Sequence, residues 1–174
     1  MTHPFKRTKG PRVYLAIDQA ARSGWAIHAN GRQQDGGSVR IADPNNMTEV
    51  LQRFAAFLES VAGQPVVVME DHAAVPANKG LPTAQVLGMG AARGRWELAL
   101  QLQGLPMSKI RKYSHLEWRR TAGIPPRTKK DRAKEMSVSS AQVMLDLQVV
   151  DDNHADASWL AQHAYNDDLL KGIR

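Results

Sequence analysis

The sequence of 174 residues contains no cysteine, few aromatic residues and no long apolar run. Without cysteine there is neither a disulfide framework nor a thiolate zinc site, and a reducing compartment is the expected setting. No run approaches the roughly 18 apolar residues that a membrane span requires. The first residues are basic and polar, unlike a signal peptide. We therefore expect a soluble, intracellular protein.

Acidic residues are also in deficit, since 17 Asp and Glu stand against 23 Lys and Arg, a formal net charge of +6. Such a surplus is typical of nucleic-acid-binding proteins, because Lys and Arg neutralise phosphates and release counterions. A basic domain without such a partner has the same composition. Separated basic tracts around acidic spots suit an enzyme that grips phosphates and holds a metal ion between them. The basic tracts are residues 6–12, 109–120 and 127–134, and the acidic pairs are residues 70–71, 151–152 and 167–168.

The chain has the length and the apolar periodicity of one α/β domain. We find no repeat or linker, so residues 12–174 are predicted to form a single domain after a basic N-terminal tail of residues 1–11. A meander of strands followed by strand–helix units predicts a mixed five-stranded sheet, with antiparallel and parallel strands, flanked by helices. The predicted strands are residues 12–18, 24–28, 38–41, 65–70 and 107–113. The predicted helices are residues 46–61, 83–103, 114–123 and 128–146, and a last helix from residue 151 or 152 onward.

Four acidic side chains fall at the ends of these predicted elements. Asp18 closes the first strand and Glu70 closes the central strand, which is where sheets of this class form sites. Asp152 and Asp156, four residues apart, face the same side of the last helix. Such carboxylates repel one another unless a cation lies among them, and Mg²⁺ prefers oxygen ligands. Taken singly, each acid also fits a turn residue or a helix cap, and the spacing alone leaves both interpretations open.

Three segments carry a family resemblance. They are residues 17–26 (Ile-Asp-Gln-Ala-Ala-Arg-Ser-Gly-Trp-Ala), 68–71 (Val-Met-Glu-Asp) and 151–157 (Asp-Asp-Asn-His-Ala-Asp-Ala). In this order and at these separations they are similar to the three acidic motifs of RuvC-like Holliday junction resolvases, particularly phage-type members.

The resemblance implies a ribonuclease H-like fold and a homodimer that resolves four-way DNA junctions by paired phosphodiester hydrolysis. It implies two Mg²⁺ ions per active site, with Mn²⁺ able to substitute, because paired ions activate a water and stabilise the leaving oxygen. It also implies the cytoplasm of a bacterium or of a phage-infected host cell.

Metal ligands follow from the resemblance residue by residue. Asp18 resembles the acid that bridges both ions, Glu70 the acid of the central strand, and Asp156 the acid of the last helix. Asp152, one turn before Asp156, is the expected fourth ligand. The sequence departs from a common family pattern at Asn153, where an acid or histidine is usual, so the choice among Asp151, Asp152 and Asn153 stays open. It also has Gln19 and Ala20 in place of a frequent Pro-Gly.

Basic residues ahead of the last motif also resemble those that contact the scissile region in the family. Lys130 and Lys134 share a helix face, and we assign Lys130 to the scissile phosphate, where it would stabilise developing negative charge. A solvated charged face explains these lysines equally well. Trp118 fits the core, or a stacking role on opened bases. The predicted DNA-binding residues are Lys109, Arg111, Lys112, Arg119, Arg120, Lys129, Lys130 and Lys134.

Gly90 and Gly94, in the predicted helix 83–103, resemble the dimer-forming helix of the family, with packing inside the chain as the alternative. Other functions are compatible with the sequence. One is another ribonuclease H-like nuclease, which cuts RNA–DNA hybrids or transfers strands. A second is an actin-like or sugar-kinase-like ATPase, although that class needs two domains. A third is a junction-binding protein without catalysis.

Overall fold

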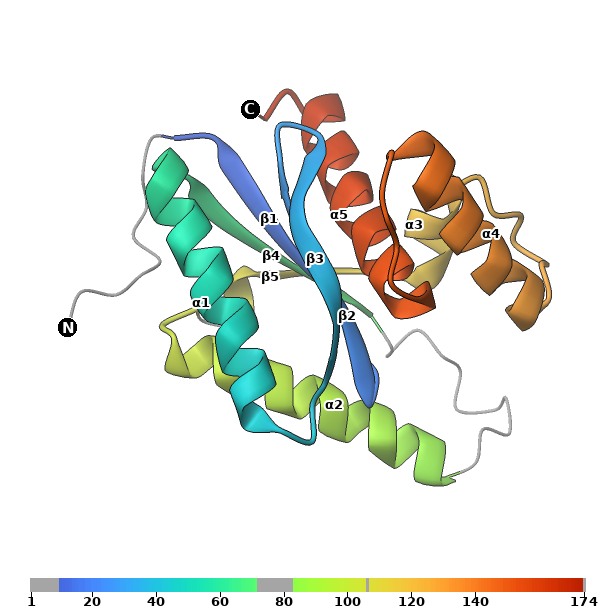
Figure 1. Cartoon of the computed structure of the whole chain (residues 1–174), viewed down its shortest axis with the longest axis horizontal. Helices are drawn as coiled ribbons and strands as arrows, with labels where there is room; N and C mark the ends of the chain where they lie inside the picture. The colour runs from blue at the N-terminus through green and yellow to red at the C-terminus, as the bar shows by residue number, and fades with distance from the viewer. Residues whose placement is uncertain (1–9, 72–82, 106, 174) are drawn as a thin grey trace.

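The computed structural model describes residues 10–71, 83–105 and 107–173 (Figure 1). Almost all of the predicted basic tail of residues 1–11 therefore lies outside the described residues. The elements in chain order are β1 (Arg12–Asp18), β2 (Arg22–Ala29), β3 (Arg32–Arg40), α1 (Pro44–Val61), β4 (Gln64–Glu70), α2 (Thr83–Leu102), a 3₁₀ turn (Met107–Lys109), β5 (Ile110–Tyr113), α3 (His115–Thr121), α4 (Lys130–Met144) and α5 (Asp152–Leu170).

The five strands form one mixed sheet in the order β3-β2-β1-β4-β5. β1, β2 and β3 are an antiparallel meander, whereas β4 runs parallel to β1 and β5 runs parallel to β4. The register pairs Asp18 with Gly24 and Ile17 with Met69. The predicted fold class, a mixed five-stranded sheet flanked by helices, is confirmed.

Helices cover both faces of the sheet (Figure 1). Alternate residues of β1 face opposite sides, as the pleat of a strand requires. Leu15 and Ile17 join the core beneath α1 and α2, and Tyr14 and Ala16 join the core beneath α3, α4 and α5. The central strands are therefore buried on both faces, which explains the almost unbroken apolar run of β4.

Several element boundaries differ from the sequence prediction, among them those of α1, β3 and β5. α1 begins at Pro44, not at residue 46, because Asp43 caps it by accepting from the Asn45 backbone N–H at 2.9 Å, and proline suits the first helical position. β3 begins at Arg32 rather than at residue 38 and runs through Gly36 and Gly37, because both glycines pair with β2. β5 is shorter than the predicted strand, since Met107–Lys109 form a 3₁₀ turn.

A buried carboxylate anchors the end of α5 to the sheet. Asp168 is 1% exposed, and it accepts hydrogen bonds from Arg12 at 2.6 Å, the Tyr14 hydroxyl at 2.7 Å and Arg111 at 2.7 Å. Burial alone would raise the pKa of Asp168, but these three donors lower it below its usual value. The far end of α5 is thereby fixed against β1 and β5.

Candidate active site

The acidic site lies where β1 and β4 end and α5 begins. Asp18 and Glu70 are the last residues of two parallel, hydrogen-bonded neighbours, so they emerge at the same edge of the sheet. Gly24, the partner of Asp18 in β2, lets the first turn of α5 approach closely. A Cβ atom at Gly24 would lie 1.8 Å from the carbonyl oxygen of Asn153. This contact holds the start of α5 over the sheet edge.

The negative charges of the site repel one another. Burial, and then repulsion from Glu70, Asp156 and Asp152, raises the pKa of Asp18 well above its ordinary value. Burial raises the pKa of Asp156 to about 7, and the charge of Glu70 adds to the rise although a hydrogen bond from Ser137 opposes it. The pKa of Glu70 is also raised, first by burial. The predicted quartet of Asp18, Glu70, Asp152 and Asp156 is thus brought together.

Each of three acids is held by a donor from α3 or α4. Trp118 Nε1 donates to Glu70 Oε2 at 3.3 Å. Ser137 Oγ donates to Asp156 Oδ1, and Lys134 Nζ forms an ion pair with Asp152 Oδ2. Among the described residues, no three Asp, Glu or His side chains stand in the arrangement of a metal site.

The donor set nevertheless fits a hard divalent cation. It consists of carboxylate oxygens, which Mg²⁺ prefers, and it carries an excess of negative charge that raises the pKa values of its own members. A bound cation would lower those pKa values again, because it favours the ionised carboxylates.

Asp151 serves a different purpose from its neighbour Asp152. Its side chain caps α5 by accepting from the His154 backbone N–H at 3.0 Å, and it also accepts from Ser38 Oγ at 2.6 Å. The backbone of Asn153 packs on Gly24. Among the three residues left open by the sequence, the geometry favours Asp152 as the fourth acid of the site.

The predicted basic residues form two groups. The first group, Lys134 and Arg119, lies beside the acids of the site. The charge of Lys134 lowers the pKa of Asp18, and that of Arg119 lowers the pKa values of Glu70 and Asp156. Arg119 also lies 5.5 Å from the ring centre of Trp118. Lys130, which the sequence assigned to the scissile phosphate, is exposed one turn before Lys134. Lys134 is therefore the lysine of that face that reaches the acids.

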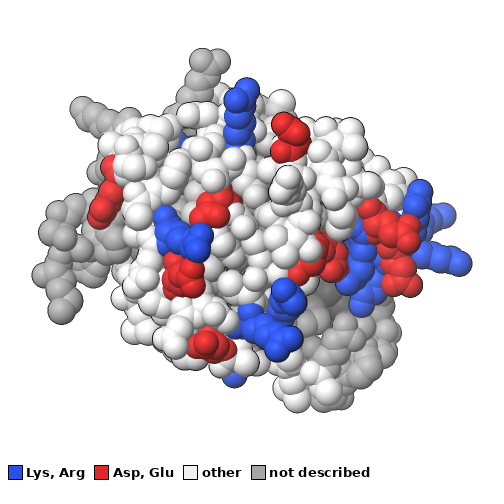
Figure 2. Space-filling model, viewed as in Figure 1, with Lys and Arg blue, Asp and Glu red and all other residues white. Residues whose placement is uncertain are grey.

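The other predicted basic residues form the second group. Lys129 directly precedes α4 and Arg120 lies in the last turn of α3, and both are exposed. Figure 2 shows that basic and acidic side chains gather at the end of the molecule that α4 forms. Arg111 is instead bound to Asp168, and Lys112 lies 3.5 Å from Glu97. These two residues of β5 pair with acids of α5 and α2, and Lys112 is exposed. Lys109 is exposed before β5.

Sequence reasoning missed Ser137 and the hydrogen bond of Trp118. A signal for Ser137 existed, because it lies between Ala133 and Ala141 at spacings of four, and these three residues form the buried stripe of α4. A polar residue in such a stripe usually has a buried partner. Nothing local in the sequence pairs Trp118 with Glu70.

None of the helices in the described part of the chain combines the length and the apolar character needed to cross a bilayer.

The sheet order and the flanking helices define a ribonuclease H-like α/β fold. A solved structure with a similar fold is that of T. thermophilus RuvC in complex with Holliday junction substrate. Its TM-score is 0.58, with 18% sequence identity over 91% of this chain and 96% of that chain. Neither a protein-family model nor a curated protein matches the sequence. The chain therefore has a RuvC-like fold.

Proposed function

We propose that the protein is a divalent-metal-dependent endonuclease that resolves Holliday junctions by paired phosphodiester hydrolysis, in the manner of phage-type RuvC-like enzymes. The observation that carries this proposal is the meeting of Asp18, Glu70, Asp152 and Asp156 at one edge of a ribonuclease H-like sheet. The similar fold of a RuvC bound to a Holliday junction substrate supports the choice of branched DNA.

The four acids would hold Mg²⁺, as two ions per site, and Mn²⁺ would substitute. When bound, the metal supplies activation of a water and stabilisation of the leaving oxygen. Trp118 and Ser137 orient the Glu70 and Asp156 carboxylates, which reduces the reorganisation that metal binding requires. Lys134 is the cation beside the acids, and once released from Asp152 it would be available to neutralise charge on a phosphate.

DNA binding would involve the basic residues that surround this edge. We propose that Arg119, Arg120, Lys129 and Lys130 hold the phosphates on either side of the cut, because they flank the acids on α3 and α4. Arg111 and Lys112 contribute through the fold instead, since each is paired with an acid. Phosphate contacts of this kind give affinity that falls steeply with salt concentration.

A homodimer is part of the proposal, with α2 as the contact between two copies. Leu87, Ala91, Gly94, Leu98 and Leu102 follow one another at helical spacing, and all five are exposed. A Cβ atom added at Gly94 or at Gly90 would meet nothing within 4 Å in the described structure. Because no neighbour in the described structure requires glycine at these positions, the two glycines suit close approach of a second α2. Two copies of the chain would then supply two active sites for paired cuts.

Cleavage of labelled substrates tests the proposal. A four-way junction, a fork and an RNA–DNA hybrid are each incubated with the protein in Mg²⁺, Mn²⁺ or EDTA, with Asp18→Asn as the inactive control. We expect metal-dependent paired nicks in the junction alone. Preferential cutting of the hybrid would support the other nuclease class. Junction binding without cutting in either metal would identify a binding protein.

A further inference from the structure

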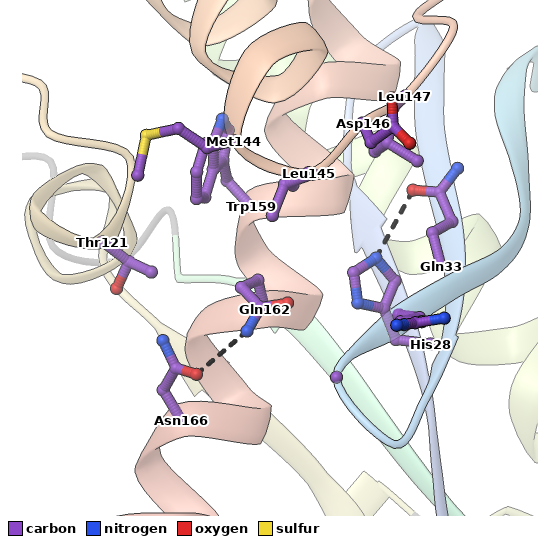
Figure 3. Close-up of a pocket in the computed structure, with 12 residues that line it drawn as sticks. His28, Gln33, Thr121, Met144, Leu145, Asp146, Leu147, Trp159, Gln162 and Asn166 are labelled. Carbon is purple, nitrogen blue, oxygen red and sulfur yellow. Dashed lines mark hydrogen bonds between the residues drawn. The ribbon is translucent and has the colours of Figure 1, made fainter.

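A second polar site lies away from the acidic cluster. It is a pocket of about 650 Å³ between the β2–β3 hairpin, the segment that follows α4, and the middle of α5 (Figure 3). None of Asp18, Glu70, Asp152 and Asp156 lines it. Its volume falls within the range of about 300–1,000 Å³ typical of small-molecule sites.

Two buried polar atoms of the pocket have no partner among the residues that the structure describes. They are His28 Nδ1 and Gln162 Oε1. His28 is 1% exposed, and its ring lies on one side of the pocket while the Gln162 amide lies on the other (Figure 3). Gln162 Nε2 donates a hydrogen bond to Asn166 Oδ1 at 2.9 Å, so the oxygen of the same amide points away from Asn166. Buried polar atoms without a hydrogen bond are costly and uncommon, which points to a missing partner.

The surrounding hydrogen bonds determine what His28 offers. The Val150 backbone N–H donates to His154 Nδ1 at 3.2 Å, so a neutral His154 carries its proton on Nε2. Burial lowers the pKa of His154 and thus favours this neutral ring. Gln33 Nε2 lies 2.8 Å from His154 Nε2, which would set two donors against each other, so the side-chain amide of Gln33 must be turned over and present its oxygen there, the reverse of its orientation in Figure 3.

The amide nitrogen of Gln33 then faces Ser158 Oγ and His28 Nε2. Ser158 Oγ can accept from it, because its own proton is donated to the His154 carbonyl oxygen at 2.8 Å. His28 Nε2 becomes an acceptor, and the proton of the ring is placed on Nδ1. Burial lowers the pKa of His28 to about 4, which keeps the ring neutral at physiological pH. His28 consequently offers a donor to the pocket, and Gln162 offers an acceptor.

We propose that this pocket binds a nucleobase, with the edge of the base bridging His28 Nδ1–H and Gln162 Oε1. Every nucleobase has a hydrogen-bond donor beside an acceptor on one edge, and this pairing is what the two unpartnered atoms require. Leu145 and Leu147 supply apolar surface for the faces of the ring. Arg32 lies exposed at the pocket, where it can reach a phosphate attached to the base.

Nucleoside titration of the metal-free protein tests the proposal without any cleavage. Thymidine is added to ¹⁵N-labelled protein while the His28 ring and the Gln162 amide are followed by NMR. We expect saturable shifts at both, and a His28 ring protonated on Nδ1 before ligand is added. N3-methylthymidine, which lacks the ring N–H, should bind at least tenfold more weakly. Equal affinity for the two nucleosides would overturn the proposal, whatever the behaviour of any variant.

Gln162→Leu removes the acceptor while keeping the side-chain volume, and Gln101→Leu is the matched control at an exposed position of α2. We expect at least a tenfold loss of thymidine affinity in the first variant and none in the second. The source of the base is tested with a single-stranded oligonucleotide that carries one thymine, beside the same strand with an abasic site. Preference for the thymine strand over free thymidine indicates a base of the DNA, and the reverse order indicates a free nucleoside. Absence of shifts with every ligand contradicts the proposal, and it leaves the nuclease proposal untouched.

Discussion

At the scale of single residues, Asp18 is a buried carboxylate that three other acids of the site repel. Its pKa is raised by burial and by three neighbouring acids, so its charged form is unfavourable in the metal-free fold. A group whose pKa is higher in the folded than in the unfolded state makes the fold less stable as the pH rises. The metal-free protein should therefore lose stability as the pH rises above the ordinary pKa of an aspartate.

Asp18→Asn removes this charge. We expect it to stabilise the metal-free protein at pH 8 by at least about 1 kcal/mol, roughly 2–4 °C in Tm for a domain of this size. At pH 5 the gain should shrink, because the raised pKa of Asp18 means that less of its charge is present there than at pH 8. The same variant should abolish junction cutting and preserve junction binding. Thermal unfolding in EDTA at both pH values, beside a cleavage assay, measures these effects.

Asp131→Asn, at an exposed position of α4, is the control and should change Tm little at either pH. Mg²⁺ should raise the Tm of the unaltered protein more at pH 8 than at pH 5, since ligands must be deprotonated to bind it. A destabilised Asp18→Asn protein at pH 8 would show that the carboxylate is not under repulsion.

Lys134 and Lys130 provide a matched pair for the second prediction. Lys134 holds Asp152, so it competes with a metal ion for the same carboxylate. Lys134→Met should therefore strengthen Mn²⁺ binding severalfold and still reduce the rate of junction cutting at least tenfold. Lys130→Met should leave Mn²⁺ affinity unchanged and weaken DNA binding in a salt-dependent way. Titration followed by electron paramagnetic resonance gives the affinities, and equal Mn²⁺ affinity of the two variants would contradict the competition.

The sequence could predict the acids but not their partners. Asp18 and Glu70 stand at strand ends that can be recognised from apolar runs, and Asp156 stands at a helical spacing from Asp152. Lys130 and Lys134 share a helix face, so spacing could not choose between them. The choice depends on how α4 lies against α5, which is set by contacts such as the hydrogen bond of 3.2 Å from Trp159 Nε1 to the Ser137 carbonyl oxygen.

At the scale of elements, the buried strands were the easiest to predict, because β1 and β4 are apolar on both faces. β3 was harder, since it is an edge strand whose Gly36 and Gly37 are typical of turns. Pairing with β2 outweighs that local preference. In α1, the helix was predicted to begin at residue 46, but Asp43 caps it so that it begins at Pro44. Strand pairing, which the sequence does not display, set the extent of β3, whereas the side chain of Asp43 set the start of α1.

The packing of β2 against α5 supports the third prediction. Gly24→Ala would place a Cβ atom 1.8 Å from the Asn153 carbonyl oxygen, so the start of α5 must move away from the sheet. We expect a loss of about 2–4 kcal/mol in the free energy of unfolding, as for severe overpacking, and weaker Mn²⁺ binding because Asp152 and Asp156 move with α5. Chemical denaturation and metal titration measure the two effects.

Gly37→Ala is the control for this packing. Its Cβ atom would lie 3.5 Å from Trp25 Nε1, an ordinary contact in a strand of the same sheet. Because alanine suits a strand better than glycine does, the change in stability should stay within about 1 kcal/mol. If the Gly24→Ala protein is as stable as the Gly37→Ala protein, the close approach of Asn153 to Gly24 is not needed to hold α5 in place.

At the scale of the whole molecule, α5 links two regions of opposite electrostatic character. Its first turn carries the repelling acids, whereas its far end is held by Asp168, whose three donors compensate its charge. The far end is held to the sheet, and under the proposed function a bound cation would compensate the repulsion at the acidic end. This division explains why a basic protein concentrates unfavourable negative charge at one edge of its sheet.

The last prediction concerns the assembly of two copies through α2. Gly94→Leu adds a large side chain at an exposed point where no neighbour in the described chain lies within 4 Å of the new Cβ atom. Within one copy the substitution should stabilise the helix by up to about 1 kcal/mol, since glycine is a poor helix former. Between copies it should separate the two helices, and the dimer dissociation constant should rise at least tenfold in sedimentation equilibrium. Gly94→Ala, which adds only one methyl group, should gain helix stability and lose little affinity. The expected effects have opposite signs, since folding becomes more favourable and dimerisation less favourable, so the two measurements separate folding from assembly. If the Gly94→Leu protein unfolds at a higher temperature but dimerises with unchanged affinity, the dimer contact lies on another surface.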